Sequence, residues 1–352
     1  MNDKQAKEAI DSIIKKARVH LYKPIQIAEI LYRDRVVGDI DLLNLESYRS
    51  TSKQWRNDIC NRFLGRTSTS SSKFQDDLFN PTAIPPNVLS HLGIINRENN
   101  GIVEAYIYRR FHDRMSQMST GLEYCVLNNE KTFKLQDFLE LFWHEPGLRR
   151  SIDKIYEIVV YSLFSALVEA IGVTIEVSID NSKNDILHEF DDFAKLVLGL
   201  SSEHNSFKLN AKIHRVGVTN AADRGLDMFA NFGLIIQIKH LSLTEEIAED
   251  IANSVTGDRI VIVCKDSEEK LIISLLTQIG WKARIQSIIT ESNLLAWYEK
   301  ALRGKYTKEI GSILLNNIRA EIQLEFPTTN NKDFLSFMED RGYTLLNNEL
   351  WK

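Results

Sequence analysis

Apolar residues recur at three- and four-residue spacing through much of the first 145 residues. This spacing predicts amphipathic helices. The clearest are IQIAEILYRD, QWRNDICNRFLG and KLQDFLELFW, at residues 25–34, 54–65 and 134–143. The Pro-rich NPTAIPPN, at residues 80–87, predicts a turn or a joint between subdomains. We therefore expect residues 1–150 to form a mainly helical region and a candidate DNA-recognition part.

From residue 151 the pattern changes to helices that alternate with short apolar runs. A long helix is predicted over residues 151–172, ending at Gly172, and a strand over VTIEVSI follows it. Further helices are expected at residues 185–200, 244–255 and 267–280, with β-like runs at 211–218, 224–230, 234–241, 259–266 and 283–289. This alternation predicts a mixed α/β core over residues 151–290 with helices on both faces of a central sheet, and residues 291–352 predict a helical C-terminal extension.

Composition limits the class of protein. With 352 residues, 43% of them apolar, the chain is long enough to bury a sizeable core. Its three cysteines, Cys60, Cys125 and Cys264, stand far apart without CxxC spacing, which disfavours a disulfide framework or a structural zinc site. No stretch approaches eighteen consecutive apolar residues, and we expect a cytoplasmic protein.

Charge is unevenly distributed along the chain. The net charge of −5 argues against a protein that simply coats DNA, since phosphates demand excess Lys and Arg. Residues 48–74 are nonetheless locally basic, with only Asp58 against six cations. These cations are Arg49, Lys53, Arg56, Arg62, Arg66 and Lys73, and the first five are our candidate DNA contacts. The alternative is a helix whose aromatic residues Tyr48, Trp55 and Phe63 are core and whose arginines are ordinary surface charge.

The segment AADRGLDMFANFGLIIQIKHL, residues 221–241, predicts a β-hairpin around the loop Asn231-Phe232-Gly233. Symmetric closure pairs Phe229 with Ile235, Met228 with Ile236 and Asp227 with Gln237. Alternation then places only apolar residues on one face, namely Leu226, Met228, Ala230, Leu234, Ile236 and Ile238.

The opposite face gathers Asp227, Gln237 and Lys239. Carboxylate and amide oxygens suit Mg²⁺, which commonly needs one or two carboxylates plus substrate phosphate. Lys239 would orient the attacking water or offset charge in the transition state of phosphodiester hydrolysis. The alternative is a strand that merely exposes three polar side chains. Phosphate loops of the GxGxxG and Walker types are absent, which leaves a metal ion as the only cofactor suggested.

This hairpin resembles the motif of the PD-(D/E)xK nucleases. Leu226 stands at the proline position, Asp227 is the first acid, Gln237 replaces the second acid, and Lys239 is the lysine. QxK variants are similar to the Mrr-like branch of that superfamily. The resemblance implies a glutamate from the preceding helix, for which Glu157 is the first candidate and Glu169 the second. Asp223 and Arg224 precede the motif as candidates to contact metal or phosphate, although a plain turn explains them equally well.

A wider resemblance covers most of the chain. The segments VHLYKPIQIAEILYRDR, SKQWRNDICNRFLGRTSTSSSKFQDDLF and ADRGLDMFANFGLIIQIKHL look like those of the HaeII-type restriction endonucleases. The resemblance implies Mg²⁺-dependent cleavage of duplex DNA at the palindrome RGCGCY, with a companion cytosine methyltransferase encoded nearby. A palindromic target favours a homodimer. Two alternatives remain, a structure-specific nuclease of repair or junction resolution and a catalytically inactive DNA-binding regulator.

Overall fold

The chain forms two compact units in a computed structural model. The described residues are 1–17, 20–67, 84–144, 152–216, 226–239, 259–266, 270, 273, 274, 285–325 and 331–351. The first unit contains Met1–Ile158 and Ile318–Lys352, and the second contains Val159–Val216 and described residues of Gly225–Asn317. These limits differ from the predicted segments 1–150, 151–290 and 291–352. The reason is that helices α8 (Ile152–Ile171) and α14 (Thr307–Glu325) each contribute residues to both units.

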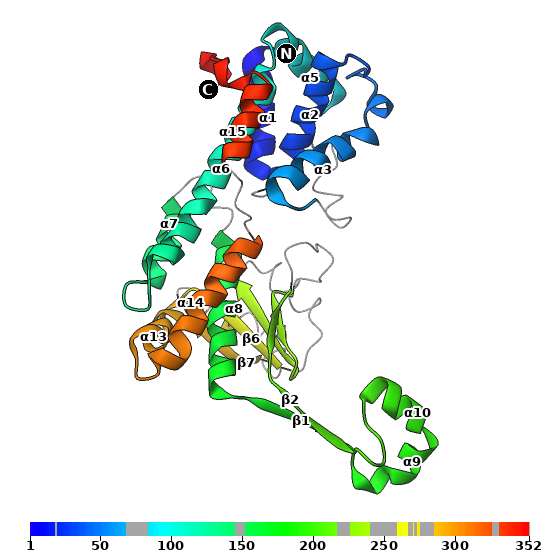
Figure 1. Cartoon of the computed structure of the whole chain (residues 1–352), viewed down its shortest axis with the longest axis vertical. Helices are drawn as coiled ribbons and strands as arrows, with labels where there is room; N and C mark the ends of the chain where they lie inside the picture. Colours follow the sequence, from blue (N-terminus) through cyan, green and yellow to red (C-terminus); the bar gives the residue numbers. More distant parts are fainter. Residues whose placement is uncertain are drawn as a thin grey trace. The chain divides into compact units, whose positions relative to one another are not determined.

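Helices make up the described part of the first unit, as the sequence predicts (Figure 1). They are α1 (Asp3–Lys16), α2 (Tyr22–Val36), α3 (Thr51–Leu64), α5 (Pro86–Glu98), α6 (Ile102–Leu127), α7 (Leu135–His144), the start of α8 (Ile152–Ile171), the end of α14 (Thr307–Glu325) and α15 (Asn331–Asp340). Short 3₁₀ turns lie at Leu45–Ser47, Tyr343–Leu345 and Glu349–Trp351. Helix α7 shows why the pattern works, because Leu135, Phe138, Leu139 and Phe142 form one buried stripe.

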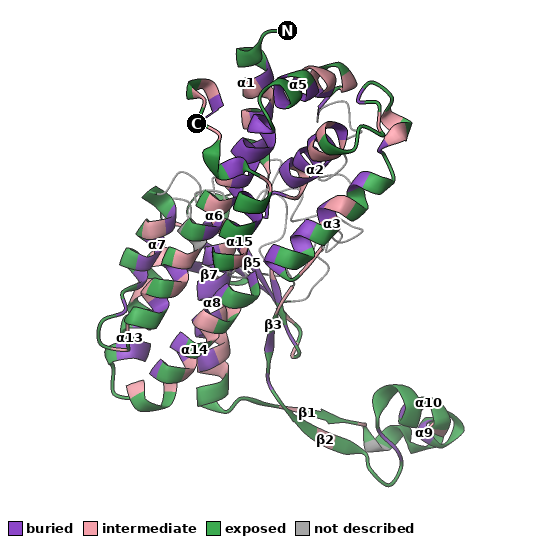
Figure 2. Ribbon diagram, turned by 45° about the horizontal axis from the view of Figure 1, so that its top comes forward, coloured by how far each residue is buried: buried purple, intermediate pink, exposed green. Residues whose placement is uncertain are grey.

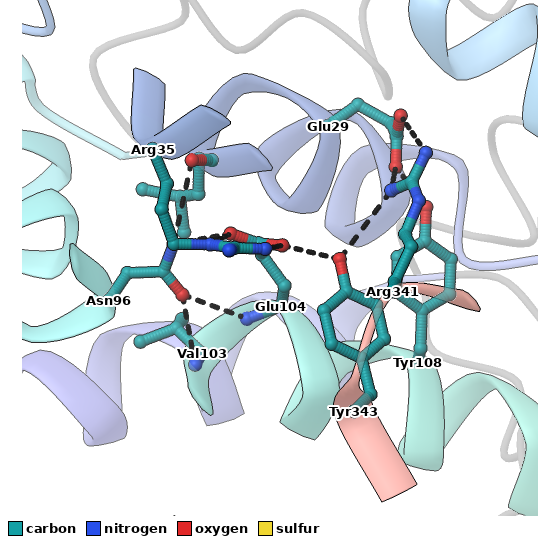
Figure 3. A network of polar contacts seen from close by, with 9 residues as sticks. Glu29, Arg35, Asn96, Val103, Glu104, Tyr108, Arg341 and Tyr343 are labelled. Carbon is teal, nitrogen blue, oxygen red and sulfur yellow. Dashed lines mark hydrogen bonds and ion pairs between the residues drawn. The ribbon is translucent and has the colours of Figure 1, made fainter. Parts of the chain in front are cut away.

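A buried polar network ties the C-terminal residues of the first unit to α2 and α6 (Figure 3). Arg341 donates to both carboxylate oxygens of Glu29, at 2.6 and 3.1 Å, and the Tyr108 hydroxyl donates to the same carboxylate. Glu104, fully buried, accepts two hydrogen bonds of 2.9 Å from Arg35 and another from the Tyr343 hydroxyl. The paired charges offset the cost of burying these carboxylates.

The second unit contains a five-stranded sheet in the order β3-β4-β5-β6-β7. Its strands are β3 (Ile213–Arg215), β4 (Met228–Ala230), β5 (Leu234–Lys239), β6 (Arg259–Cys264) and β7 (Ile285–Thr290). The first three run antiparallel and the last three parallel, which confirms the predicted mixed sheet. Helix α13 (Glu291–Arg303) packs on α8, where the Tyr298 hydroxyl donates to the Val159 carbonyl at 2.7 Å.

Helices on both faces of the sheet stay a prediction. The expected helix at residues 244–255, and most of that at 267–280, lie outside the described residues. Among the described residues, no helix is both long and apolar enough to cross a bilayer.

The strand predicted at residues 173–179 exists but does not join the main sheet. As β1 (Thr174–Ser178) it pairs antiparallel with β2 (Ser206–Asn210), a strand that the sequence pattern did not predict, in a separate two-stranded ribbon. The helix expected at 185–200 is divided into α9 (Asn184–Glu189), α10 (Asp191–Phe193) and a π-helical turn at Ala194–Leu198. Figures 1 and 2 show the ribbon leading away from the end of α8 to these short helices.

All three cysteines are reduced and have no exposed surface. Burial raises the pKa of the Cys125 thiol to about 12. Because the thiolate is the reactive form, Cys125 is protected both by its surroundings and by its protonation. The absence of disulfides agrees with the expectation drawn from the cysteine spacing.

Candidate functional site

The predicted hairpin is present, with the predicted register. Met228 pairs with Ile236 and Phe229 with Ile235. The turn closes on a 3.1 Å hydrogen bond from the Gly233 N–H to the Ala230 carbonyl. Gly233 has a φ of +83°, a conformation that a side chain would disfavour. The loop sequence therefore fixes the alignment of the two strands.

One face of the hairpin is core, as expected. Met228 and Ile236 have no exposed surface, and Ala230 and Ile238 are buried too. This face anchors the hairpin, because shifting the register by one residue would bring these apolar side chains into water. The opposite face is thereby held in a fixed orientation.

Continuing the register by one residue beyond Met228 and Ile236 predicts that Asp227 lies opposite Gln237 on that face. The Asp227 carboxylate is half-buried, and its Oδ2 accepts a 2.7 Å hydrogen bond from the Ile238 N–H. Gln237 is fully buried. The bond to the β5 backbone fixes the carboxylate against the neighbouring strand.

Lys239 is the last residue of β5, paired with Cys264 of β6. Its side chain lies outside the described residues, as do Asp223, Arg224 and His240. Strand alternation predicts that the Lys239 side chain shares the face of Gln237, two residues earlier. Its chemical role stays a prediction.

The oxygen donors present suit Mg²⁺ better than a soft metal. Within the described residues, no group of three or more His, Cys, Asp and Glu side chains is arranged to hold a metal ion. Asp227 with the amide of Gln237 would offer one formal charge and one neutral oxygen. Mg²⁺ keeps several waters and takes further oxygen ligands from substrate phosphate, so this small donor set fits that ion.

The two glutamates considered on α8 lie in different surroundings. Glu157 is buried, and both of its carboxylate oxygens accept from Lys154 Nζ at 2.7 Å. Glu169 is exposed and lines a cavity of about 440 Å³ together with Lys212 and His214. A metal-binding role for either glutamate stays a prediction, and Glu157 already has a cation beside it.

Sequence reasoning missed a pair of aromatic rings on the face of Asp227. His214 of β3 pairs with Phe229 of β4, and the two rings stack with centroids 5.1 Å apart. Phe229 stands two residues from Asp227 and keeps 43% of its surface exposed. The alternating pattern of AKIHRVGV, residues 211–218, could have predicted a strand that contains His214. Only the pairing of β3 with β4 shows that His214 shares a face with Phe229.

Three of the proposed DNA-contacting arginines make contacts within the first unit. Arg56 is buried and donates to Gln26 Oε1 at 3.3 Å. Arg62 forms a two-point ion pair with Asp333 at 3.0 and 2.6 Å, which lowers the pKa of that carboxyl. Arg66 donates to the Glu325 carbonyl at the end of α14, where a cation is favourable. Buried Arg56 is therefore not kept among the proposed DNA contacts.

Three cations of the described part of the basic segment are exposed, namely Arg49, Lys53 and Arg62. The Arg49 side chain is 52% exposed and forms a 3.0 Å ion pair with Glu46, and Lys53 lies in the first turn of α3. Tyr48 and Phe63 are core residues, as the alternative interpretation of this segment expected. Lys73 lies outside the described residues. The segment thus combines structural arginines with a smaller exposed basic surface.

Comparison with known proteins identifies the family. The family model described as HaeII restriction endonuclease matches residues 6–343. The chain belongs to this family. It is 63% identical over 344 residues to the type II restriction enzyme HaeII of Haemophilus aegyptius, covering 97% of this chain and 98% of that protein. It is 58% identical over 347 residues to the type II restriction enzyme NgoBI of Neisseria gonorrhoeae, covering 98% of each chain.

Membership in the HaeII restriction endonuclease family makes the chain a type II restriction endonuclease, a site-specific deoxyribonuclease. Neither a repair nuclease nor an inactive regulator accounts for identity of this extent along the whole chain. No solved structure matches the chain.

Proposed function

We propose that this restriction endonuclease hydrolyses both strands of duplex DNA at the hairpin of β4 and β5, on a core of the PD-(D/E)xK type. The observations that support the proposal are the register Met228–Ile236 and Phe229–Ile235, which predicts Asp227 opposite Gln237, and the hydrogen bond from the Ile238 N–H to Asp227. The mixed order β3-β4-β5-β6-β7 supports this type of core, in which an acid and a lysine come from neighbouring strands.

In this proposal Asp227 and Gln237 hold a single Mg²⁺. The bound ion would draw charge from a phosphate oxygen and lower the pKa of a coordinated water. The Ile238 N–H orients the Asp227 carboxylate, and the neutral Gln237 amide keeps the charge of the protein ligands at one. Lys239 would hold the attacking water or offset negative charge as the phosphorus–oxygen bond breaks. One carboxylate favours one ion over two.

The DNA site and the partners follow from the family resemblance. We propose RGCGCY as the target, a homodimer that matches its two half-sites, and a companion cytosine methyltransferase that protects host DNA without forming a stable complex. Recognition of a two-fold symmetric sequence by two identical subunits lets each subunit cut one strand.

Removal of the metal ion tests the proposed chemistry. We expect unmethylated plasmid DNA with one RGCGCY site to be linearised in Mg²⁺ and left intact in EDTA, with activity restored by excess Mg²⁺. The matched control is the same plasmid with one inner base pair of the site changed, since a mismatched pair costs about 1–3 kcal/mol of binding. Cleavage in EDTA would refute the metal proposal, and equal cutting of both plasmids would refute the site.

Lys53→Ala and Arg49→Ala test the exposed basic surface of the first unit. If these side chains contact phosphates, each variant weakens DNA binding, and each reduces the slope of log affinity against log salt by about one. Binding is measured by fluorescence anisotropy in EDTA, which separates it from cleavage. The matched control is Lys131→Ala, an exposed lysine outside the basic segment. Unchanged slopes for both variants would remove this surface from the proposed interface.

A further inference from the structure

Residues 173–211 form an arm of the second unit, made of the ribbon β1–β2 and a small helical head (Figures 1 and 2). The ribbon has two unlike faces. Pairing of Ile175 with Leu209 and of Val177 with Phe207 puts four apolar residues on one face. The other face carries polar pairs, among them Glu176 with Lys208 at 3.5 Å.

Among the described residues, no helix or third strand covers the apolar face of the ribbon. A two-stranded sheet is marginally stable in water unless a third strand or a helix packs on its apolar face. Leu209 is 47% exposed and Val177 36% exposed. The apolar face is therefore an incomplete core that a partner would complete.

The helical head, residues 184–200, exposes more apolar surface than the ribbon does. Within residues 184–200 it buries only Leu187, Ala194 and Leu200. Six large apolar residues are more than 40% exposed: Ile186, Phe190, Phe193, Leu196, Val197 and Leu198. Leu196 reaches 86%. Scattered apolar residues are ordinary on a protein surface, but six large exposed ones within residues 186–198 are more than an isolated side chain, and exposed apolar surface of this extent is typical of an interaction site.

The exposed apolar surface is large enough for a dimer. At roughly 150–200 Å² of total surface for each such residue, exposed fractions between 46% and 86% leave about 600 Å² exposed over the six residues of the head. Two-fold symmetry doubles this to about 1,200 Å², the lower limit for specific interfaces, before the ribbon face is added. A symmetric contact between two arms therefore has the area that stable association requires.

Charge argues against DNA as the occupant. The arm carries seven acidic residues, namely Glu176, Asp180, Asp185, Glu189, Asp191, Asp192 and Glu203, against Lys183, Lys195 and Lys208. Its net charge of −4 would repel phosphates, and between two arms the same repulsion must be outweighed by the apolar contact.

We propose that the arm is the self-association surface of this restriction endonuclease. Two copies pack head to head and ribbon to ribbon about a two-fold axis, and each covers the apolar face of the other. The inference rests on the proposed homodimer but not on the proposed metal site. Because each arm is acidic, the two arms repel each other, and added salt should strengthen the dimer by screening this repulsion. The Debye length falls from about 10 Å at 0.1 M salt to about 3 Å at 1 M salt.

Sedimentation equilibrium of the full chain without DNA tests the proposal. We expect a dimer for the wild type, and self-association at least about tenfold weaker for Leu196→Asp and Phe193→Asp, which place a charge in the apolar contact. The matched control is Leu345→Asp in the first unit, since Leu345 is 88% exposed and lies outside the arm. Circular dichroism and melting curves verify that every variant folds.

Cross-linking provides a second readout of the same contact. The native cysteines are buried, so Leu196→Cys gives a single reactive thiol per chain. A short bismaleimide should link two such chains and leave the wild type unlinked. If both arm variants dimerise as strongly as the wild type, the arm is not the self-association surface, although the proposed homodimer still stands. A wild type that stays monomeric would overturn both, while DNA cleavage is scored separately and reports only on the metal site.

Discussion

Asp227→Asn is expected to reduce DNA cleavage by at least about a thousandfold, because it removes the one carboxylate charge proposed to hold Mg²⁺. Asparagine keeps an oxygen that can accept the Ile238 N–H, so the hairpin geometry should survive. The measurement is single-turnover cleavage of plasmid DNA at saturating enzyme over a range of Mg²⁺ concentrations. A metal-binding defect predicts that very high Mg²⁺ restores part of the rate.

The control for this substitution is Asp137→Asn, which removes an exposed carboxylate from α7 far along the chain from the hairpin. It should cut DNA at the wild-type rate. DNA binding in EDTA should be similar for the wild type and both variants. If Asp227→Asn cleaves DNA like the wild type while Asp137→Asn does the same, the active site lies elsewhere in the chain.

Glu104→Gln is expected to lower the free energy of unfolding of the first unit by about 3–5 kcal/mol, because it leaves the Arg35 guanidinium without its anion in a largely buried place. Figure 3 shows how the carboxylate connects α2 through Arg35 with the C-terminal Tyr343. The loss should appear in urea denaturation followed by far-ultraviolet circular dichroism.

Glu46→Gln is the matched comparison for the buried pair. It breaks the ion pair with Arg49, in which the two side chains are 72% and 52% exposed. Solvated pairs contribute little, so its unfolding midpoint should stay close to that of the wild type. Equal losses for the two variants would show that the Glu104 network does not hold the first unit together.

The basic segment shows where sequence reasoning stopped. Charge counting grouped Arg49, Lys53, Arg56, Arg62 and Arg66 as one surface, since all lie within a short stretch. The partners of Arg62 and Arg66 lie far away in the sequence. Arg62 pairs with Asp333, 271 residues away, and Arg66 with the carbonyl of Glu325, 259 residues away. A spacing pattern carries no information about a partner at such a separation, so it cannot tell a structural arginine from an exposed one.

By itself the sequence determined the helices of the first unit and the hairpin with its register. These features depend on apolar periodicity and on a glycine in a tight loop, both of which are local. Only the tertiary structure decided that β1 leaves the main sheet to pair with β2, that Gln237 is fully buried, and that His214 stacks on Phe229 beside Asp227. The physical reason is that strand pairing and burial are set by which distant segments meet, and a one-dimensional pattern does not record those meetings.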